Sequence, residues 1–393
     1  MKSFVMQKVF DEMTSSKGRL IGLDIIRVFA IYYVFVQHGK VLVSESFQNT
    51  YSYLVNIPIE GVSVFFLLSG FLIGNILNKE LKKDGLSREK LSYFWVRRIL
   101  RIVPSYLVVL LILYFLNVNT NSFNWYYLFF SQNLLHDQAD FFKVSWSLSV
   151  EMWFYFLFPV TLFVLLKLFK NRTQALLVTV GVFLVGSLLM RLLNYFSPEV
   201  FELETVRKVV FFRLDSVMFG VLASIMYFNY RPQWDKFASL IAVIGVFSLG
   251  LMMYVMANAS GIISSNTLNS NGFSFENFYC KVNIYYIEAL PVLFFLPICT
   301  KLRIVRWGIM NKLIVFVSKI SYTVYLTHAS LVLWFIVPIL EKNSFVIEHP
   351  QKQMILYIAY ILLTLLFSTL LYIVVEKPFT VWRYKISSAA DKK

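Results

Sequence analysis

Ten runs of about 20 mostly apolar residues dominate the chain, and each is long enough for a helix that crosses a membrane. The polar segments between them are shorter than about 30 residues, which is too short for a separate domain. We place the runs near residues 20–43, 54–78, 99–117, 146–166, 174–196, 208–229, 237–257, 282–299, 313–340 and 353–375. The sequence therefore predicts an all-α integral membrane protein. Residues 20–376 form its membrane domain, with a cytoplasmic segment at 1–19 and a cytoplasmic tail at 377–393.

Composition excludes the main alternatives. Hydrophobic residues make up 58% of the chain and charged residues 15%, whereas an ordinary soluble domain is about 25% charged. Cys280 and Cys299 are too few for a disulfide framework, and we expect no metal site. The net charge of +15 would favour nucleic-acid binding in a soluble protein. In a membrane protein the positions of the charges matter more, so we expect membrane lipids and no nucleic acid as partners.

The distribution of cations predicts the topology. With the N-terminus inside, the inner segments carry 25 Lys and Arg and the outer segments carry 6, as the positive-inside rule requires. Ten spans with both termini cytoplasmic fit this asymmetry. An eleventh candidate, Phe123–Leu135, is short and polar in part, and as a span it would invert everything after it. We interpret it as interfacial or re-entrant, held by Trp125, Tyr126 and Tyr127.

The first run contains three ionisable side chains, which are costly inside a membrane and therefore mark a candidate functional site. Asp24 and Arg27 are three residues apart and can pair, and Arg27 and His38 are eleven apart, which places them on nearly the same helix face. His38 lies about 16 Å further out along the helix than Arg27. We predict a functional polar stripe; the alternative is a structural Asp24–Arg27 pair with an interfacial His38.

Before the third run, the cations Arg97, Arg98 and Arg101 precede Pro104. Arg98 and Arg101 face the same way, and guanidinium groups suit bidentate phosphate binding better than ammonium groups do. We predict a site for a cytosolic ligand with several phosphates. The alternative is ordinary charge that sets the topology.

The fourth run opens with Trp146, and Ser147, Glu151 and Tyr155 follow at spacings of four on one helix face. Glu151 is at a depth similar to that of His38. A carboxylate that orients an imidazole is the arrangement general-base chemistry needs, so we predict a His38–Glu151 pair.

Two weaker signals lie in later runs. Arg213 and Asp215 are close enough in sequence to pair locally, which would make them structural. His328 lies in the middle of the ninth run. It could be a second catalytic imidazole, or a residue whose hydrogen bonds pack helices together.

These motifs, in this order, resemble the acyltransferase-3 family, bacterial membrane enzymes that move acyl groups, usually acetyl, onto cell-surface glycans. The resemblance covers nearly the whole chain. It rests on GLDIIRVFAIYYVFVQHG, GVSVFFLLSGFLIG at 61–74, the Arg-x-x-Arg pair in YFWVRRILRIVPSY, WSLSVEMWFYFLFP at 146–159, DSVMFG at 215–220, ISYTVYLTHASL at 320–331 and the closing Glu376–Pro378.

The resemblance implies that His38, Arg98 and Arg101 are needed for activity. It also implies a cytosolic acyl-CoA, most simply acetyl-CoA, as co-substrate with no bound cofactor, a glycan acceptor outside, and a place in the bacterial inner membrane. Many members carry an additional C-terminal esterase-like domain, whereas this chain ends soon after its last run. We therefore expect acyl transfer to finish inside the membrane domain or to pass to a separate protein.

The sequence thus predicts a membrane-bound O-acyltransferase of an O-antigen, capsule or exopolysaccharide type of glycan, which could form homo-oligomers. We expect Asp24, Arg27, His38 and Glu151 at the catalytic centre, and Arg97, Arg98 and Arg101 on acyl-CoA. Acceptor specificity should lie in loops 118–145 and 258–281. The rival hypothesis is a proton-coupled transporter of a lipid or glycan, because intramembrane Asp, Glu and His also form proton relays. Six residues are candidates for acceptor binding: Trp146, Ser147, Tyr155, Arg213, Asp215 and His328.

Overall fold

A computed structural model describes residues 19–44, 47, 51, 59–83, 85–197, 201–263, 282, 284–303, 308–344, 346 and 349–390, and within these ranges it is helical with no strand. Eight of the helices are long and apolar enough to cross a membrane, and two shorter apolar helices lie at 238–254 and 290–301. These ten correspond to the ten predicted runs, so the all-α membrane fold is confirmed. Most of the predicted 258–281 loop and residues 1–18 lie outside the described ranges.

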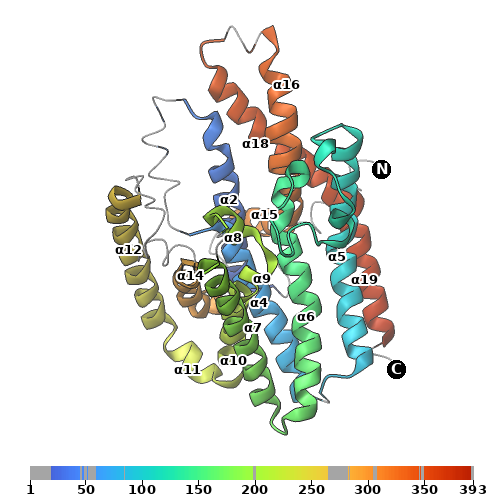
Figure 1. Ribbon diagram of the computed structural model, residues 1–393, viewed down its shortest axis with the longest axis vertical. Helices are drawn as coiled ribbons and strands as arrows, with labels where there is room; N and C mark the ends of the chain where they lie inside the picture. The colour runs from blue at the N-terminus through green and yellow to red at the C-terminus, as the bar shows by residue number, and fades with distance from the viewer. Residues whose placement is uncertain are drawn as a thin grey trace.

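Within the described residues, ten long helices form the bundle, and Figure 1 shows how they are arranged. Their bounds are α2 Ile21–Gly39, α4 Gly61–Lys82, α5 Arg88–Phe115, α6 Trp146–Leu168, α7 Arg172–Tyr195, α10 Asp215–Asn229, α12 Ala238–Ile263, α14 Ile284–Lys301, α15 Gly308–Thr327 and α18 Lys352–Leu371. Short helices extend or join them: η1 Lys40–Leu42, α8 Leu203–Lys208, α9 Val210–Arg213, α11 Arg231–Lys236, η6 His328–Ile336, α16 Val337–Glu341, η7 Tyr372–Glu376 and α19 Lys377–Ala390.

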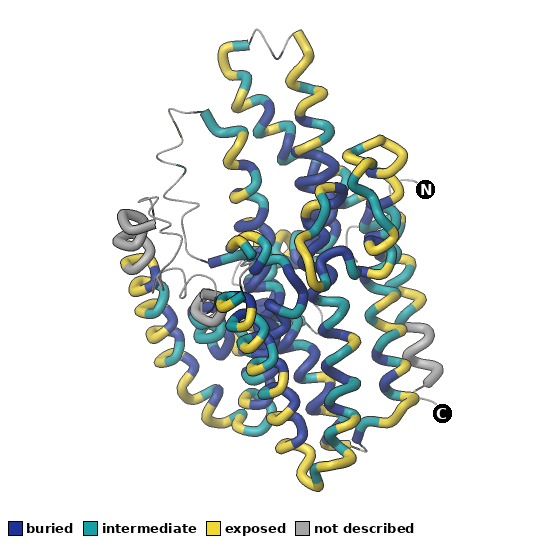
Figure 2. The backbone as a smooth tube through the Cα atoms, in the orientation of Figure 1, coloured by how far each residue is buried: buried dark blue, intermediate teal, exposed yellow. Residues whose placement is uncertain are grey.

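Buried side chains concentrate in the middle of the bundle, while exposed ones cover its periphery (Figure 2). Many exposed side chains on the peripheral helices are large and apolar, among them Phe247 and Leu251 on α12 and Leu362 on α18. A surface of this kind suits contact with lipid and not with water. It supports the assignment of the bundle to a membrane.

Glycine residues allow α4 and α10 to pack closely, and this contact fixes the position of α4. A Cβ atom added to Gly70 would lie 2.0 Å from the Val217 carbonyl oxygen, and one added to Gly220 would lie 2.0 Å from the Leu67 carbonyl oxygen. Only glycine permits such an approach. The glycines of the 61–74 and 215–220 motifs thus have a packing role.

The segment between α5 and α6 does not cross the bundle. It forms only short 3-10 turns, η2 Thr120–Ser122, η3 Trp125–Phe129 and η4 Asp140–Ser145, as expected for a segment that is not a span. The indole of Trp153 donates to the Phe130 carbonyl oxygen at 2.9 Å, and Tyr106 donates to the Tyr127 carbonyl oxygen at 2.9 Å. The segment therefore packs against α5 and α6.

Cysteine labelling tests this topology. In a chain whose native cysteines are replaced by serine, an impermeant maleimide added outside intact cells should modify Asp140→Cys and leave Lys170→Cys unmodified. Both positions lie at helix ends, 140 before α6 and 170 after it. Outside labelling of position 170 would overturn the ten-span topology.

Residues 377–393 were predicted as a cytoplasmic tail, and the structure shows residues 377–390 as a helix. The last span continues through the π-helical turn η7 into α19, which packs along α5. The chain after residue 376 is therefore part of the bundle as far as the structure describes it.

Candidate active site

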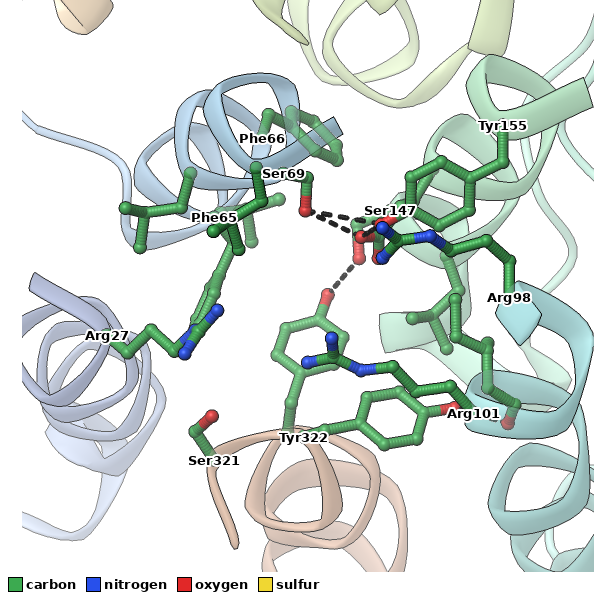
Figure 3. A pocket seen from close by; sticks show the side chains of 17 residues that line it. Arg27, Phe65, Phe66, Ser69, Arg98, Arg101, Ser147, Tyr155, Ser321 and Tyr322 are labelled. Atoms are coloured by element: carbon green, nitrogen blue, oxygen red, sulfur yellow. Dashed lines mark hydrogen bonds between the residues drawn. The ribbon is translucent and has the colours of Figure 1, made fainter. Parts of the chain in front are cut away.

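A cavity of about 770 Å³ lies inside the bundle, and three arginines reach into it. Arg27 approaches from α2 on one side, and Arg98 and Arg101 approach from α5 on the other (Figure 3). Residues of α4, α6 and α15 complete the wall, among them Ser69 and Tyr322. We call this cavity the arginine pocket.

The guanidinium groups of Arg98 and Arg101 make no hydrogen bond or ion pair with any residue that the structure describes. Arg98 lies over the rings of Phe94 and Tyr155, with its Cζ 5.4 Å and 5.1 Å from their centroids. Carboxylates act on these arginines only at longer range, Glu151 on Arg98 and Glu376 on Arg101. Cations gathered in a cavity without a bonded counter-charge form a site for an anion.

The predicted arginine trio is therefore divided. Arg98 and Arg101, three residues apart, line the pocket, whereas Arg97 is exposed and is not among the lining residues. Rotation of the helix by about 100° per residue accounts for this difference. Arg27, which we expected at the catalytic centre, takes the third place in the pocket.

Glu151 also lines the arginine pocket, and its partners are hydroxyl groups. Ser69 donates to Glu151 Oε1 at 2.6 Å, and Tyr155 donates to the same oxygen. Tyr155, which we expected on the acceptor, thus holds this carboxylate beside the arginines. Neither of these contacts involves His38.

His38 meets His328 instead of Glu151. The two rings lie 4.9 Å apart between centroids at an interplanar angle of 75°, and Nδ1 of His38 is 3.4 Å from Nε2 of His328. His328 begins the π-helical segment η6, an irregularity that is common at functional sites. The predicted His38–Glu151 pair is wrong, because Glu151 lies in the arginine pocket with Arg27, about 16 Å along α2 from His38.

The contacts of the two rings indicate where their protons lie. Nδ1 of His328 is 2.8 Å from the Tyr325 carbonyl oxygen, and Nδ1 of His38 is 2.8 Å from the Val34 carbonyl oxygen. Carbonyl oxygens only accept, so each Nδ1 carries a proton. In neutral His38 the lone pair is then on Nε2, the arrangement that a general base requires.

A double-mutant cycle on turnover distinguishes the two possible partners of His38. The losses from His38→Ala and His328→Ala should be non-additive, because the rings are in contact. The losses from His38→Ala and Glu151→Gln should add in free energy, because these side chains share no contact. Additive losses for the two histidines would show that their contact plays no part in turnover.

A hydrogen-bonded pair stands between the pocket and the histidines. The hydroxyls of Ser147 and Tyr325 are 2.6 Å apart, both residues line the arginine pocket, and the Tyr325 ring lies 5.7 Å from the His328 ring. Ser147, which we expected to bind the acceptor, therefore lies between the arginine pocket and the two histidines.

A partly buried ion cluster lies beside the histidines, at the start of α4. Glu60 accepts hydrogen bonds from Arg207 at 2.6 Å and from Arg213 at 3.0 Å, and Ser63 donates to it at 2.9 Å. Glu60 and Arg207 also act electrostatically on His38. Arg213 is therefore paired with Glu60 and not with Asp215.

Trp146 packs under this cluster. Its side chain is only 5% exposed, and its ring lies near Phe66 and below the guanidinium groups of Arg207 and Arg213. The expectation that Trp146 stacks on a sugar does not fit this position. The indole supports the arginines by cation–π contact.

Asp24 and Asp215 each have a structural partner. Asp24 accepts from Arg19 at 2.8 Å and from Ser318 at 2.6 Å, and it pairs with Arg27 at 3.4 Å as predicted. Asp215 pairs with Arg191 at 2.5 Å, and both side chains are fully buried. Neither aspartate lines the arginine pocket.

The Asp215–Arg191 pair should contribute to stability and not to acceptor binding. Asp215→Asn leaves a buried uncompensated cation, which costs about 3–5 kcal/mol. Thermal unfolding in detergent should show a lower Tm for this variant than for the double variant Asp215→Leu/Arg191→Met. If Asp215→Asn had an unchanged Tm and a raised KM for the acceptor, Asp215 would instead be a residue of the acceptor site.

Comparison with known proteins decides the family. The model described as "Acyltransferase domain" matches residues 20–373, nearly the whole chain. The chain belongs to the acyltransferase-3 family. The provisionally named O-acetyltransferase SACOL0978 of Staphylococcus aureus strain COL is 24% identical over 385 residues, covering 91% of this chain and 57% of that protein. O-acetyltransferase OatA of Staphylococcus aureus strain NCTC 8325 / PS 47 is 24% identical over 416 residues, covering 97% and 60%.

This acyltransferase-3 chain thus spans about three fifths of the length of the curated relatives that it matches. No solved structure matches it.

Several residues of this acyltransferase-3 site were not predicted from the sequence, among them Glu60, Ser69 and Tyr322. Glu60 lay inside the run predicted at 54–78, but α4 begins only at Gly61, so Glu60 precedes the helix at its first turn. The sequence did contain a signal for Glu60: it is a carboxylate directly before an apolar run that begins with glycine. Ser69 and Tyr322 are ordinary in sequence, and only the tertiary fold brings them to the pocket.

Proposed function

We propose that this family member transfers an acyl group, most simply acetyl, from acyl-CoA to a hydroxyl of a cell-surface or lipid-linked glycan at the bacterial plasma membrane. The observation that carries the proposal is the arginine pocket, where Arg98 and Arg101 meet Arg27. Arg27 pairs with Asp24, whereas Arg98 and Arg101 have no bonded counter-charge among the described residues. The relatives reported above carry the name O-acetyltransferase, which supports acyl transfer to a hydroxyl as the type of reaction.

The donor's phosphates suit the arginine pocket. Guanidinium groups bind phosphate oxygens through paired, charge-assisted hydrogen bonds, and the apolar wall strengthens these bonds by excluding water. Apolar side chains of α4, such as Phe65 and Leu72, line the same cavity. They would contact the uncharged part of the donor.

The acyl group would travel towards the histidines. His38 lies about 16 Å beyond Arg27 by helical rise, so a flexible pantetheine arm would run past Ser147 and Tyr325 to place the thioester there. The acceptor hydroxyl oxygen then attacks the thioester carbonyl carbon, and Nε2 of His38 takes the hydroxyl proton. The C–S bond breaks, and the leaving thiolate receives that proton. The products are an O-acyl ester and free CoA thiol.

A histidine nucleophile is a variant of this route. Nε2 of His38 would first take the acyl group and release CoA, and the acceptor hydroxyl would then attack the acyl-imidazole. Both routes give the same products and need the same lone pair on Nε2.

Release of CoA thiol tests the proposal against a proton-coupled transporter. The purified full chain is incubated with [1-¹⁴C]acetyl-CoA and cell-envelope glycan. We expect glycan-dependent release of free thiol, with about one mole of label on the glycan per mole of thiol. A protein that releases no thiol and instead moves protons across liposome membranes would be the transporter.

A further inference from the structure

A second cavity lies where the segment after α5 meets the π-helical segment η6. Unlike the arginine pocket, it has no arginine among its described lining residues: three uncharged polar residues and one ion pair form its polar part, and three aromatic residues and a valine form its apolar part. The residues that matter here are Asn117, Asn119, Asp140, Lys143, Ser330 and Trp334.

The polar rim of this cavity is preorganised. Asn117 and Asn119 adopt left-handed backbone conformations, with φ of 57° and 48°, which asparagine tolerates better than most residues. The amide of Asn119 donates to the Asp140 carbonyl oxygen at 3.3 Å. Lys143 pairs with the Asp140 carboxylate at 3.3 Å. Amide, carboxylate and ammonium groups thus line one wall together.

Ser330 provides an independent sign of a ligand. Its side chain is 2% exposed, yet its hydroxyl has no hydrogen-bond partner among the described residues. A buried hydroxyl without a partner is costly, and such groups usually await water or a ligand. Ser330 lines the cavity two residues after His328.

Trp334 connects this cavity to the histidines. Its ring is 39% exposed, lines the cavity and lies below the Lys143 ammonium, 5.6 Å from the ring centroid. The ring of His38 lies 6.0 Å from the same indole at an interplanar angle of 72°. A molecule bound against Trp334 would therefore lie next to the group that we assign as the base.

We propose that this cavity is the acceptor subsite and that it binds a saccharide ring. A pyranose would lay its C–H face on the Trp334 indole, and its hydroxyls would bond Ser330, Asn117 and Asp140. The polar part of the lining suits sugar hydroxyls, and its aromatic part suits the C–H face of the ring. The inference rests on the proposed function, because the acceptor hydroxyl must reach Nε2 of His38.

Sugar binding to the full chain in detergent tests this subsite. Saturation-transfer NMR and CoA-release kinetics are measured with three trisaccharides, chitotriose, maltotriose and mannotriose. The wild type should bind at least one. Trp334→Ala should raise the KM of that sugar at least about tenfold, Ser330→Ala by about 2- to 10-fold, and Trp334→Phe should recover part of the loss. The KM of acetyl-CoA should not change.

Trp382→Ala is the matched control, because it removes an exposed indole from α19, away from the cavity. It should leave sugar binding unchanged. A wild type that binds none of the sugars, or an unchanged sugar KM in Trp334→Ala, would overturn the subsite while glycan-dependent CoA release persists. Loss of CoA release in the wild type with every acceptor would instead overturn the proposed function.

Discussion

Replacing His38 with alanine should lower acyl transfer by about 10²- to 10⁴-fold, because the variant loses the lone pair that accepts the hydroxyl proton. The loss should appear in kcat. The Tm and the donor affinity should change little, because His38 is not among the residues that line the arginine pocket. The measurement is CoA-thiol release with cell-envelope glycan, combined with acetyl-CoA binding by calorimetry.

His349→Ala serves as the control for this variant. His349 lies between α16 and α18, in the connection beyond the end of the bundle, and is not part of either cavity. It should retain wild-type turnover. If His38→Ala acylates glycan at close to the wild-type rate, His38 has no part in the chemistry and the base must be sought elsewhere.

Removing the pocket arginines should weaken donor binding. Arg98→Ala and Arg101→Ala each remove a charge-assisted contact to phosphate, worth about 1.5–3 kcal/mol, which corresponds to about a 10- to 150-fold rise in the Kd of acetyl-CoA. The double variant should lose more than either single variant. Isothermal titration of the detergent-solubilised protein measures these affinities.

Arg97→Ala is a matched control on the same helix. It removes the same charge from the neighbouring position, but Arg97 is exposed and does not line the pocket. It should leave the Kd nearly unchanged at physiological salt. Equal losses from Arg97→Ala and Arg98→Ala would mean that the cluster acts only through its general positive charge.

Periodicity along one helix predicted part of this site, and contacts between helices determined the rest. The spacing of Arg98 and Arg101 placed both in one cavity, and the spacing of Asp24 and Arg27 gave their ion pair. Both inferences need only the geometry of a single helix.

Partner choice between helices could not be predicted in this way. Glu151 and His38 were paired because the sequence suggested similar depths for them, but the packing of α6 places Glu151 at the level of Arg27 and not of His38. The rotation of α6 places Glu151 with Ser69, and the contact between α2 and η6 gives His38 the partner His328. Similarly, Arg213 binds Glu60, about 150 positions away in the chain, although Asp215 is only two residues from it.

Transfer across the membrane is the most direct test of the proposed function. In that proposal the protein binds the donor near the basic ends of the helices and acylates an acceptor at the opposite end. [1-¹⁴C]acetyl-CoA, which does not cross membranes, is added to inside-out and to right-side-out vesicles that contain the protein and its glycan. We predict labelled glycan in the lumen of the inside-out vesicles and little label in the right-side-out ones, with loss of labelling in Arg98→Ala/Arg101→Ala. Equal labelling in both orientations would contradict a donor site that opens to the cytoplasm.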